Sequence, residues 1–235
     1  MEFIVKSGTP EKQRTGCIVV GVFETRKLSA VAHQIDEVSG GAIGAILRRG
    51  DLEGKAGQTL LLHNIPNLPS ERVLLVGCGK EKEFNESRYR EAAARAVTTL
   101  KDTGTTEATF YLTELDVKGR DIPWKVRQAV EVTEAALYRF DRLKSKPNNQ
   151  RRALKRVVLA VPKRSDLTPG EQAIKEGQAI AEGVRVAVVE ADDIDSVRDF
   201  AFQSRLMQWN TVKIHATYSM EEALEVQRRI THEIG

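Results

Sequence analysis

The first residues that could do chemistry form a glycine-containing turn after an apolar run at residues 73–76. Gly77, Cys78, Gly79 and Lys80 follow one another there, and glycines at such a place let backbone N–H groups approach a phosphate. The spacing fits neither known loop. A P-loop needs four residues before its Gly-Lys pair and Ser or Thr after it, and the dinucleotide-binding loop needs a third glycine where this chain has Lys82. We therefore interpret the segment as a tight strand-to-loop turn.

Candidate metal ligands and nucleophiles are scattered along the chain. The histidines have no second ligand at the His-x-x-x-His spacing. They are His33, His63, His215 and His232. The acidic residues 190–195 lack EF-hand spacing, and carboxylates there suit the start of a helix. Cys17 and Cys78 have no activating partner in the sequence, so we expect buried core thiols in a reducing compartment. These residues predict neither a catalytic nor a metal site.

The strongest charge feature is a basic stretch at residues 142–165 that contains no acidic residue. Its cations are Arg142, Lys144, Lys146, Arg151, Arg152, Lys155, Arg156, Lys163 and Arg164, and upstream of it lie Lys118, Arg120, Lys125 and Arg127. Such a cluster can neutralise phosphates and release counterions. Few aromatic residues are interleaved, which argues against stacking on single strands. We predict that these thirteen side chains form an interface for double-stranded DNA. The alternative is an ordinary solvated loop.

Strand-length apolar runs alternate with helical periodicity along residues 1–184. Strands are predicted at 17–23, 59–63, 72–76, 108–112 and 157–161. Helices are predicted at 28–38, 42–47, 85–104, 121–140 and 168–183. Asn85 and Asp121 are expected as helix N-caps, and Thr168 opens a capping box. The alternation predicts an α/β layered domain with a largely parallel sheet.

Residues 185–235 predict a separate, smaller unit. A β-α-β-α order is expected, with strands at 186–189 and 212–216. Six basic and nine acidic side chains make this part net negative, whereas residues 1–184 hold 30 basic and 24 acidic ones. The unit is too short to bury a hydrophobic core that would stabilise it alone. We expect it to pack against the larger domain, to extend the sheet of that domain, or to pair with a second chain.

Composition excludes several classes of protein. The chain has 235 residues, 41% hydrophobic and 29% charged, with 17 glycines and 7 prolines, which excludes collagen-like and low-complexity chains. No apolar run approaches the length of a membrane span, and the first residues lack the pattern of a secretory signal. We expect a cytoplasmic location.

Residues 1–184 resemble the N-terminal, non-catalytic domain of bacterial leucyl aminopeptidases. The matching segments are 1–8, 17–23, 47–55, 72–81, 112–115, 124–131 and the helix near Gly170. The resemblance implies a macro-domain-like, three-layer α/β fold with a mixed sheet flanked by helices. It also implies a relation to cytosolic, hexameric enzymes that use two zinc or manganese ions. Some bacterial members of this family also bind DNA. Those ions and the catalytic residues belong to the family's C-terminal domain, whose signature Asn-Thr-Asp-Ala-Glu-Gly-Arg does not occur in this sequence.

The C-terminal part, residues 185–235, is similar to half of a ferredoxin-like domain of the dimeric α+β barrel type. The likeness lies in residues 188–192, 207–210 and 212–215. It implies a homo-oligomer formed through this unit.

Three functions follow as hypotheses. The first is a non-catalytic accessory or regulatory domain that binds DNA, with no cofactor of its own. The second is an aminopeptidase that retains activity, or part of a metal-dependent leucyl aminopeptidase whose catalytic domain is absent from this sequence. The third is an oligomerising or structural module. A fourth hypothesis, binding of ADP-ribose, rests only on the similarity of the expected fold to macro domains.

Overall fold

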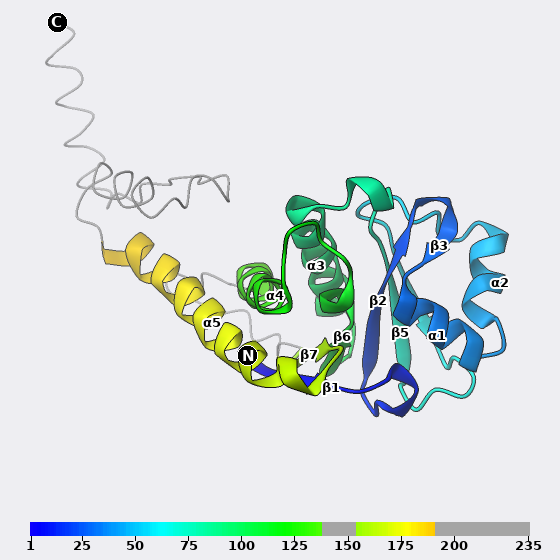
Figure 1. Cartoon of the computed structure of the whole chain (residues 1–235), viewed down its shortest axis with the longest axis horizontal. Helices are drawn as coiled ribbons and strands as arrows, with labels where there is room; N and C mark the ends of the chain where they lie inside the picture. The colour runs from blue at the N-terminus through cyan, green and yellow to red at the C-terminus, as the bar shows by residue number, and fades with distance from the viewer. Residues whose placement is uncertain (138–153, 191–235) are drawn as a thin grey trace, which may run out of the picture. The chain divides into compact units, whose positions relative to one another are not determined.

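The computed structural model describes residues 1–137 and 154–190, without the side chains of 183–190 (Figure 1). The chain divides into two compact units, Met1–Ala181 and Glu182–Gly235. The helix and strand predictions for residues 191–235, and the oligomer predicted through them, lie outside the described residues.

Seven strands form one mixed sheet in the first unit. They are β1 (Glu2–Ser7), β2 (Cys17–Phe23), β3 (Lys27–Leu28), β4 (Thr59–His63), β5 (Arg72–Gly77), β6 (Glu107–Phe110) and β7 (Arg156–Val161). The order is β1-β7-β6-β2-β5-β4, with β3 paired to β2 outside this path. All pairs are parallel except β4 with β5 and β3 with β2. The prediction of a largely parallel α/β sheet is confirmed.

Helices cover both faces of the sheet. They are α1 (Ala30–Val38), α2 (Ala42–Arg49), α3 (Glu86–Lys101), α4 (Ile122–Leu137) and α5 (Leu167–Glu190). Figure 1 shows α1 and α2 on one side of the sheet, and α3 and α4 on the other. The central strand β2 is buried along its whole length, with Ile18 and Val20 in one core cluster and Val19 in the other. This burial on two faces explains why β2 reads as a continuous apolar run.

The predicted N-caps of α3 and α4 are confirmed. The Asn85 side-chain oxygen accepts a hydrogen bond from the Arg88 backbone N–H at 3.2 Å, and Asp121 Oδ1 accepts one from the Trp124 N–H at 2.9 Å. Each bond satisfies a donor that has no partner inside its own helix.

Two predictions for residues 167–190 are wrong. Thr168 is not an N-cap, because α5 already begins at Leu167 after the short 3-10 turn η5 (Arg164–Asp166). The predicted strand at 186–189 is helical, because α5 continues past Gly183 to Glu190. A single glycine inside a helix costs only about 1 kcal/mol, so Gly183 alone is a weak signal for the end of a helix.

Candidate functional site

The glycine turn lies at the carboxyl end of β5, and residues 50–58 cross it. The N–H of Gly77 donates to Gln58 O, that of Cys78 to Val22 O, and that of Gly79 to Gly54 O, each at 2.8 Å. None of these three amides is left to hold an anion. The turn is therefore structural, as the spacing predicts.

Two glycines are required at this crossing because backbone fills the space beside them. A Cβ atom on Gly77 would lie 2.0 Å from Lys55 O. One on Gly54, whose φ is +84°, would lie 2.1 Å from Phe23 O. Open α/β sheets bind ligands in a crevice at the carboxyl ends of their strands. At β2 and β5 the chain's own backbone takes this place.

The lysines around this crossing are paired with carboxylates. Lys27 meets Glu81 at 2.5 Å, Lys55 meets Glu53 at 2.5 Å, and Lys80 meets Glu83 at 3.1 Å. The Glu53 carboxylate raises the pKa of Lys55, and that of Glu83 raises the pKa of Lys80. All six side chains are exposed, so each pair contributes little to stability. The pairing neutralises these three lysines locally.

Both cysteines lie in the interior. Cys17 is 0% and Cys78 is 1% exposed. Burial raises the pKa of each thiol to about 12. Only the thiolate is a nucleophile, so at neutral pH neither side chain is reactive. The prediction of core thiols is confirmed.

One of the predicted DNA contacts, Lys125, is an interior side chain. It is 6% exposed, and its Nζ donates to Leu115 O at 2.9 Å. Burial lowers the pKa of Lys125, although nearby carboxylates, among them Asp116 and Glu114, act in the opposite direction. The Lys125 ammonium therefore anchors a backbone carbonyl and adds nothing to a cationic surface.

Three predicted arginines are held in ion pairs. Arg120 Nε donates to Glu86 Oε1 at 2.6 Å. Arg127 lies 3.6 Å from Glu131 and 3.7 Å from Glu176 on α5. Arg156 meets Glu2 and Glu107 at 2.8 and 2.9 Å. The carboxylates neutralise these three cations locally.

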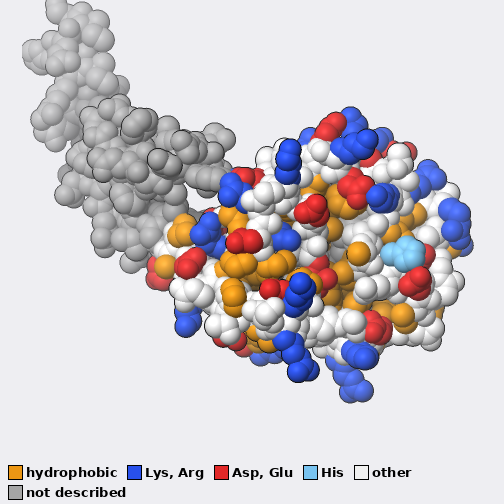
Figure 2. Space-filling model, in the orientation of Figure 1, with side chains coloured by type: hydrophobic (Ala, Val, Ile, Leu, Met, Phe, Trp, Pro, Cys, Tyr) orange, Lys and Arg blue, Asp and Glu red, His pale blue; other side chains and the backbone are white. Residues whose placement is uncertain are grey.

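The remaining described cations of the predicted interface are exposed at separate places. Lys155 precedes β7, whereas Lys163 and Arg164 follow it. A six-residue strand separates the two groups by roughly 20 Å. Lys118 is also exposed, in the segment before α4. On the face that Figure 2 shows, positive and negative side chains are interspersed. Arg142, Lys144, Lys146, Arg151 and Arg152 lie outside the described residues.

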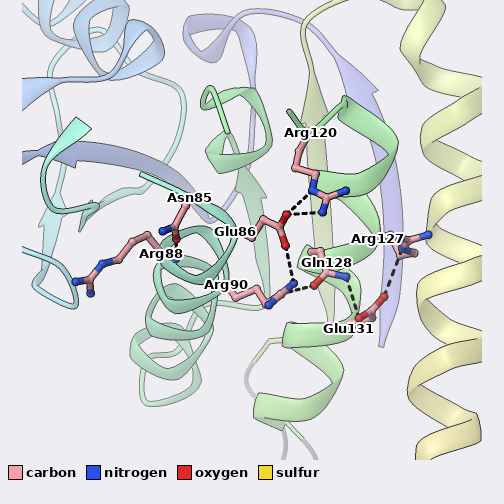
Figure 3. Close-up of polar contacts among 8 residues, drawn as sticks. All are labelled: Asn85, Glu86, Arg88, Arg90, Arg120, Arg127, Gln128 and Glu131. Atoms are coloured by element: carbon pink, nitrogen blue, oxygen red, sulfur yellow. Dashed lines mark hydrogen bonds and ion pairs between the residues drawn. The ribbon is translucent and has the colours of Figure 1, made fainter. Parts of the chain in front are cut away.

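A polar cluster that the sequence analysis missed joins α3 to α4 (Figure 3). Arg90 Nε donates to Gln128 Oε1 at 2.6 Å, and Gln128 Nε2 donates to Glu131 at 3.0 Å. Glu86 pairs with Arg90 as well as with Arg120. The spacing of Glu86 to Arg90 and of Arg127 to Glu131, four residues each, is the signal that could have indicated it.

A tryptophan lies beneath this cluster. Trp124 is 7% exposed, and the guanidinium carbons of Arg90 and Arg120 lie 5.7 and 5.2 Å from its ring centroid. Burial raises the pKa of the neighbouring Glu131. Ion pairs and cation–π contacts of this kind hold two helices together. The cluster is an interhelical brace in which carboxylates offset the positive charge.

The family's two-metal centre, which the resemblance places in the C-terminal domain, has no counterpart among the described residues. Within residues 1–137 and 154–182, no three His, Cys, Asp or Glu side chains lie close enough to hold a metal ion. Among the described helices, none is long and apolar enough to cross a membrane.

Comparison with known families gives a match over residues 19–147 to the cytosol aminopeptidase family, N-terminal domain. The match covers more than half of the chain. The chain belongs to this family. Its resemblance to the aminopeptidase N-terminal domain is thereby confirmed.

Solved structures give the fold. A mutant of tomato leucine aminopeptidase aligns with a TM-score of 0.61 at 17% identity, over 81% of this chain and 38% of that one. The bottromycin maturation enzyme BotP aligns with a TM-score of 0.53 at 20% identity, over 81% of this chain and 38% of that one. The macro domain of ganglioside induced differentiation associated protein 2 aligns with a TM-score of 0.56 at 13% identity, over 75% of this chain and 84% of that one. The fold is therefore macro-domain-like, and the chain spans 38% of the length of the first two proteins.

Proposed function

We propose that residues 1–181 serve as the non-catalytic accessory domain of a metal-dependent aminopeptidase whose metal centre another domain builds. The family match to the N-terminal domain carries this proposal. The proposal also covers the substrate class, peptides with a free N-terminus, which the sequence resemblance implies.

The chemistry of the described side chains supports a non-catalytic role. Hydrolysis with two metal ions needs several oxygen or nitrogen ligands that converge on ions about 4 Å apart. Several carboxylates in the described ranges are instead held in ion pairs with lysines and arginines, as Glu86 and Glu53 are. The two thiols are buried, and the Lys125 ammonium holds a carbonyl.

The packing of α5 supports an accessory role that depends on rigidity. A Cβ atom on Gly170 would lie 3.0 Å from the methyl groups of Val5, and one on Gly177 would lie 3.0 Å from Val130. Glycines thus let α5 approach both β1 and α4 closely. The Arg127–Glu176 ion pair adds a polar contact between α4 and α5. This part of α5 is a fixed element of the first unit.

A peptidase assay on the full chain tests the proposal. We expect no hydrolysis of leucine p-nitroanilide with added Mn²⁺ or Zn²⁺, while an active leucyl aminopeptidase in the same buffer hydrolyses it. Turnover by the purified chain that a chelator abolishes would overturn the non-catalytic role and favour an aminopeptidase that retains activity.

Binding of double-stranded DNA stays a prediction of the sequence. It now depends on the five cations between Arg142 and Arg152, together with the exposed Lys118, Lys155, Lys163 and Arg164. A fluorescence anisotropy titration at low salt tests it. If the prediction holds, R151E/R152E weakens binding and flattens its salt dependence, because fewer counterions are released. Absence of binding at low salt would contradict it.

A further inference from the structure

At one edge of the sheet, β4 has a single neighbouring strand among the described residues. That strand is β5, in the register Leu61 opposite Leu74. At one end of this pair Gly77 N–H donates to Gln58 O, and at the other Asn64 N–H donates to Glu71 O. Residues of an antiparallel strand bond alternately to one side and the other. Leu60 and Leu62 therefore bond to β5.

The other three residues of β4 present their backbone outward. By the same alternation, the N–H and C=O groups of Thr59, Leu61 and His63 point away from the sheet. No backbone hydrogen bond links residues 59–63 to any described segment other than β5. The edge thus offers three donors and three acceptors in a row.

The two edges of the sheet differ in charge. The opposite edge strand, β1, carries exposed Glu2 and Lys6, and charged side chains on an edge discourage pairing with another strand. The sequence of β4 is Thr-Leu-Leu-Leu-His, without a Lys, Glu or Pro, and its three leucines are only half-buried. An uncharged apolar edge with free backbone groups is suited to strand pairing.

We propose that a second copy of this chain pairs with β4 in antiparallel orientation, about a two-fold axis at Leu61. In this register Leu61 lies opposite Leu61 of the partner subunit, and Thr59 lies opposite His63 of the partner subunit. The outward residues are then matched only with outward residues, so all their N–H and C=O groups are paired. The two sheets join into one.

The symmetry of the strand favours a second copy over an unrelated peptide. A two-fold interface uses the same patch twice, so the patch must be complementary to itself. Here Leu60 meets Leu62 of the partner subunit, and no charged side chain of either strand meets a like charge. Cross-strand apolar pairs of this kind stabilise an antiparallel sheet. The five-residue strand makes a small interface, so the dimer depends on protein concentration.

Disulfide trapping on the full chain tests the register. In T59C/H63C the new thiols face each other across the axis, about 5.5 Å apart between Cα atoms, which suits a disulfide. We expect a disulfide-linked dimer under mild oxidation. In the matched control H63C the two introduced thiols are four residues out of register, about 13 Å apart, and no such dimer forms. The native thiols do not interfere, because both are buried.

A proline variant separates this interface from association elsewhere in the chain. L61P removes an outward N–H and leaves the hydrogen bonds of Leu60 and Leu62 to β5 intact. Light scattering should show a dimer for the unchanged chain and loss of the dimer for L61P, with circular dichroism to check the fold. A monomeric unchanged chain at submillimolar concentration, an unaffected dimer in L61P, or equal trapping of H63C and the double variant would each overturn the proposal.

Discussion

At the scale of single residues, the clearest lesson concerns Gly77 and Lys125. The Gly-x-Gly-Lys pattern predicts a turn. Sequence alone does not show that carbonyl groups of residues 50–58 accept hydrogen bonds from the amides of this turn, because these contacts join segments about 20 residues apart. Lys125 reads as a surface cation on an amphipathic helix. Its burial depends on the segment around Leu115 folding over α4, which local pattern does not reveal.

Substitution of Gly77 should test the backbone crossing. In G77A the added methyl would meet Lys55 O at 2.0 Å, so the backbone must move. We expect a loss of about 3 kcal/mol or more in the free energy of unfolding, measured with urea. The control G104A, where no atom lies within 4 Å of the added methyl, should change stability little. Equal effects would mean that the crossing is not tight.

The buried thiols predict a loss of stability in alkali. Unfolded thiols ionise near pKa 9.0, whereas burial holds those of Cys17 and Cys78 protonated up to about 12. Between these values the unfolded chain binds fewer protons, so the free energy of unfolding falls as pH rises above 9. C17A/C78A should show a shallower fall.

Thiol labelling gives an independent measurement. Neither cysteine should react with Ellman's reagent in the native chain at pH 8, and both should react in urea. Rapid labelling of the folded chain would contradict the interior placement of Cys17 and Cys78.

At the scale of elements, sequence predicts best what is local. The strand β2 and the helices α3 and α4 follow from their own apolar patterns and caps. Strand β1 escapes prediction, because it is defined by pairing with β7 about 150 residues later. The valines at 186–189 favour a strand, a preference that the context of the long helix α5 overrides. The brace between α3 and α4 likewise joins residues distant in sequence.

The cap of α3 gives a prediction at this scale. Asn85 accepts from the Arg88 N–H, so N85A leaves that donor without its partner and should cost about 1 kcal/mol in urea unfolding. N85S keeps a capping oxygen and should retain most of the stability. If the two variants lose the same amount, the cap does not stabilise α3.

At the scale of the whole molecule, the described first unit is a sheet with a core on each face. Backbone fills its crevice at β2 and β5, and the three lysines Lys27, Lys55 and Lys80 around that crossing pair with carboxylates. These features support the accessory role that we propose for this unit. The match shows the family to which the chain belongs, whereas any catalytic site has to be located by experiment.

The metal content of the purified full chain tests this account most directly. After incubation with Mn²⁺ or Zn²⁺ and removal of unbound ions, elemental analysis should find no stoichiometric pair of ions per chain. A bound pair, held tightly and required for release of leucine from a peptide, would contradict the account.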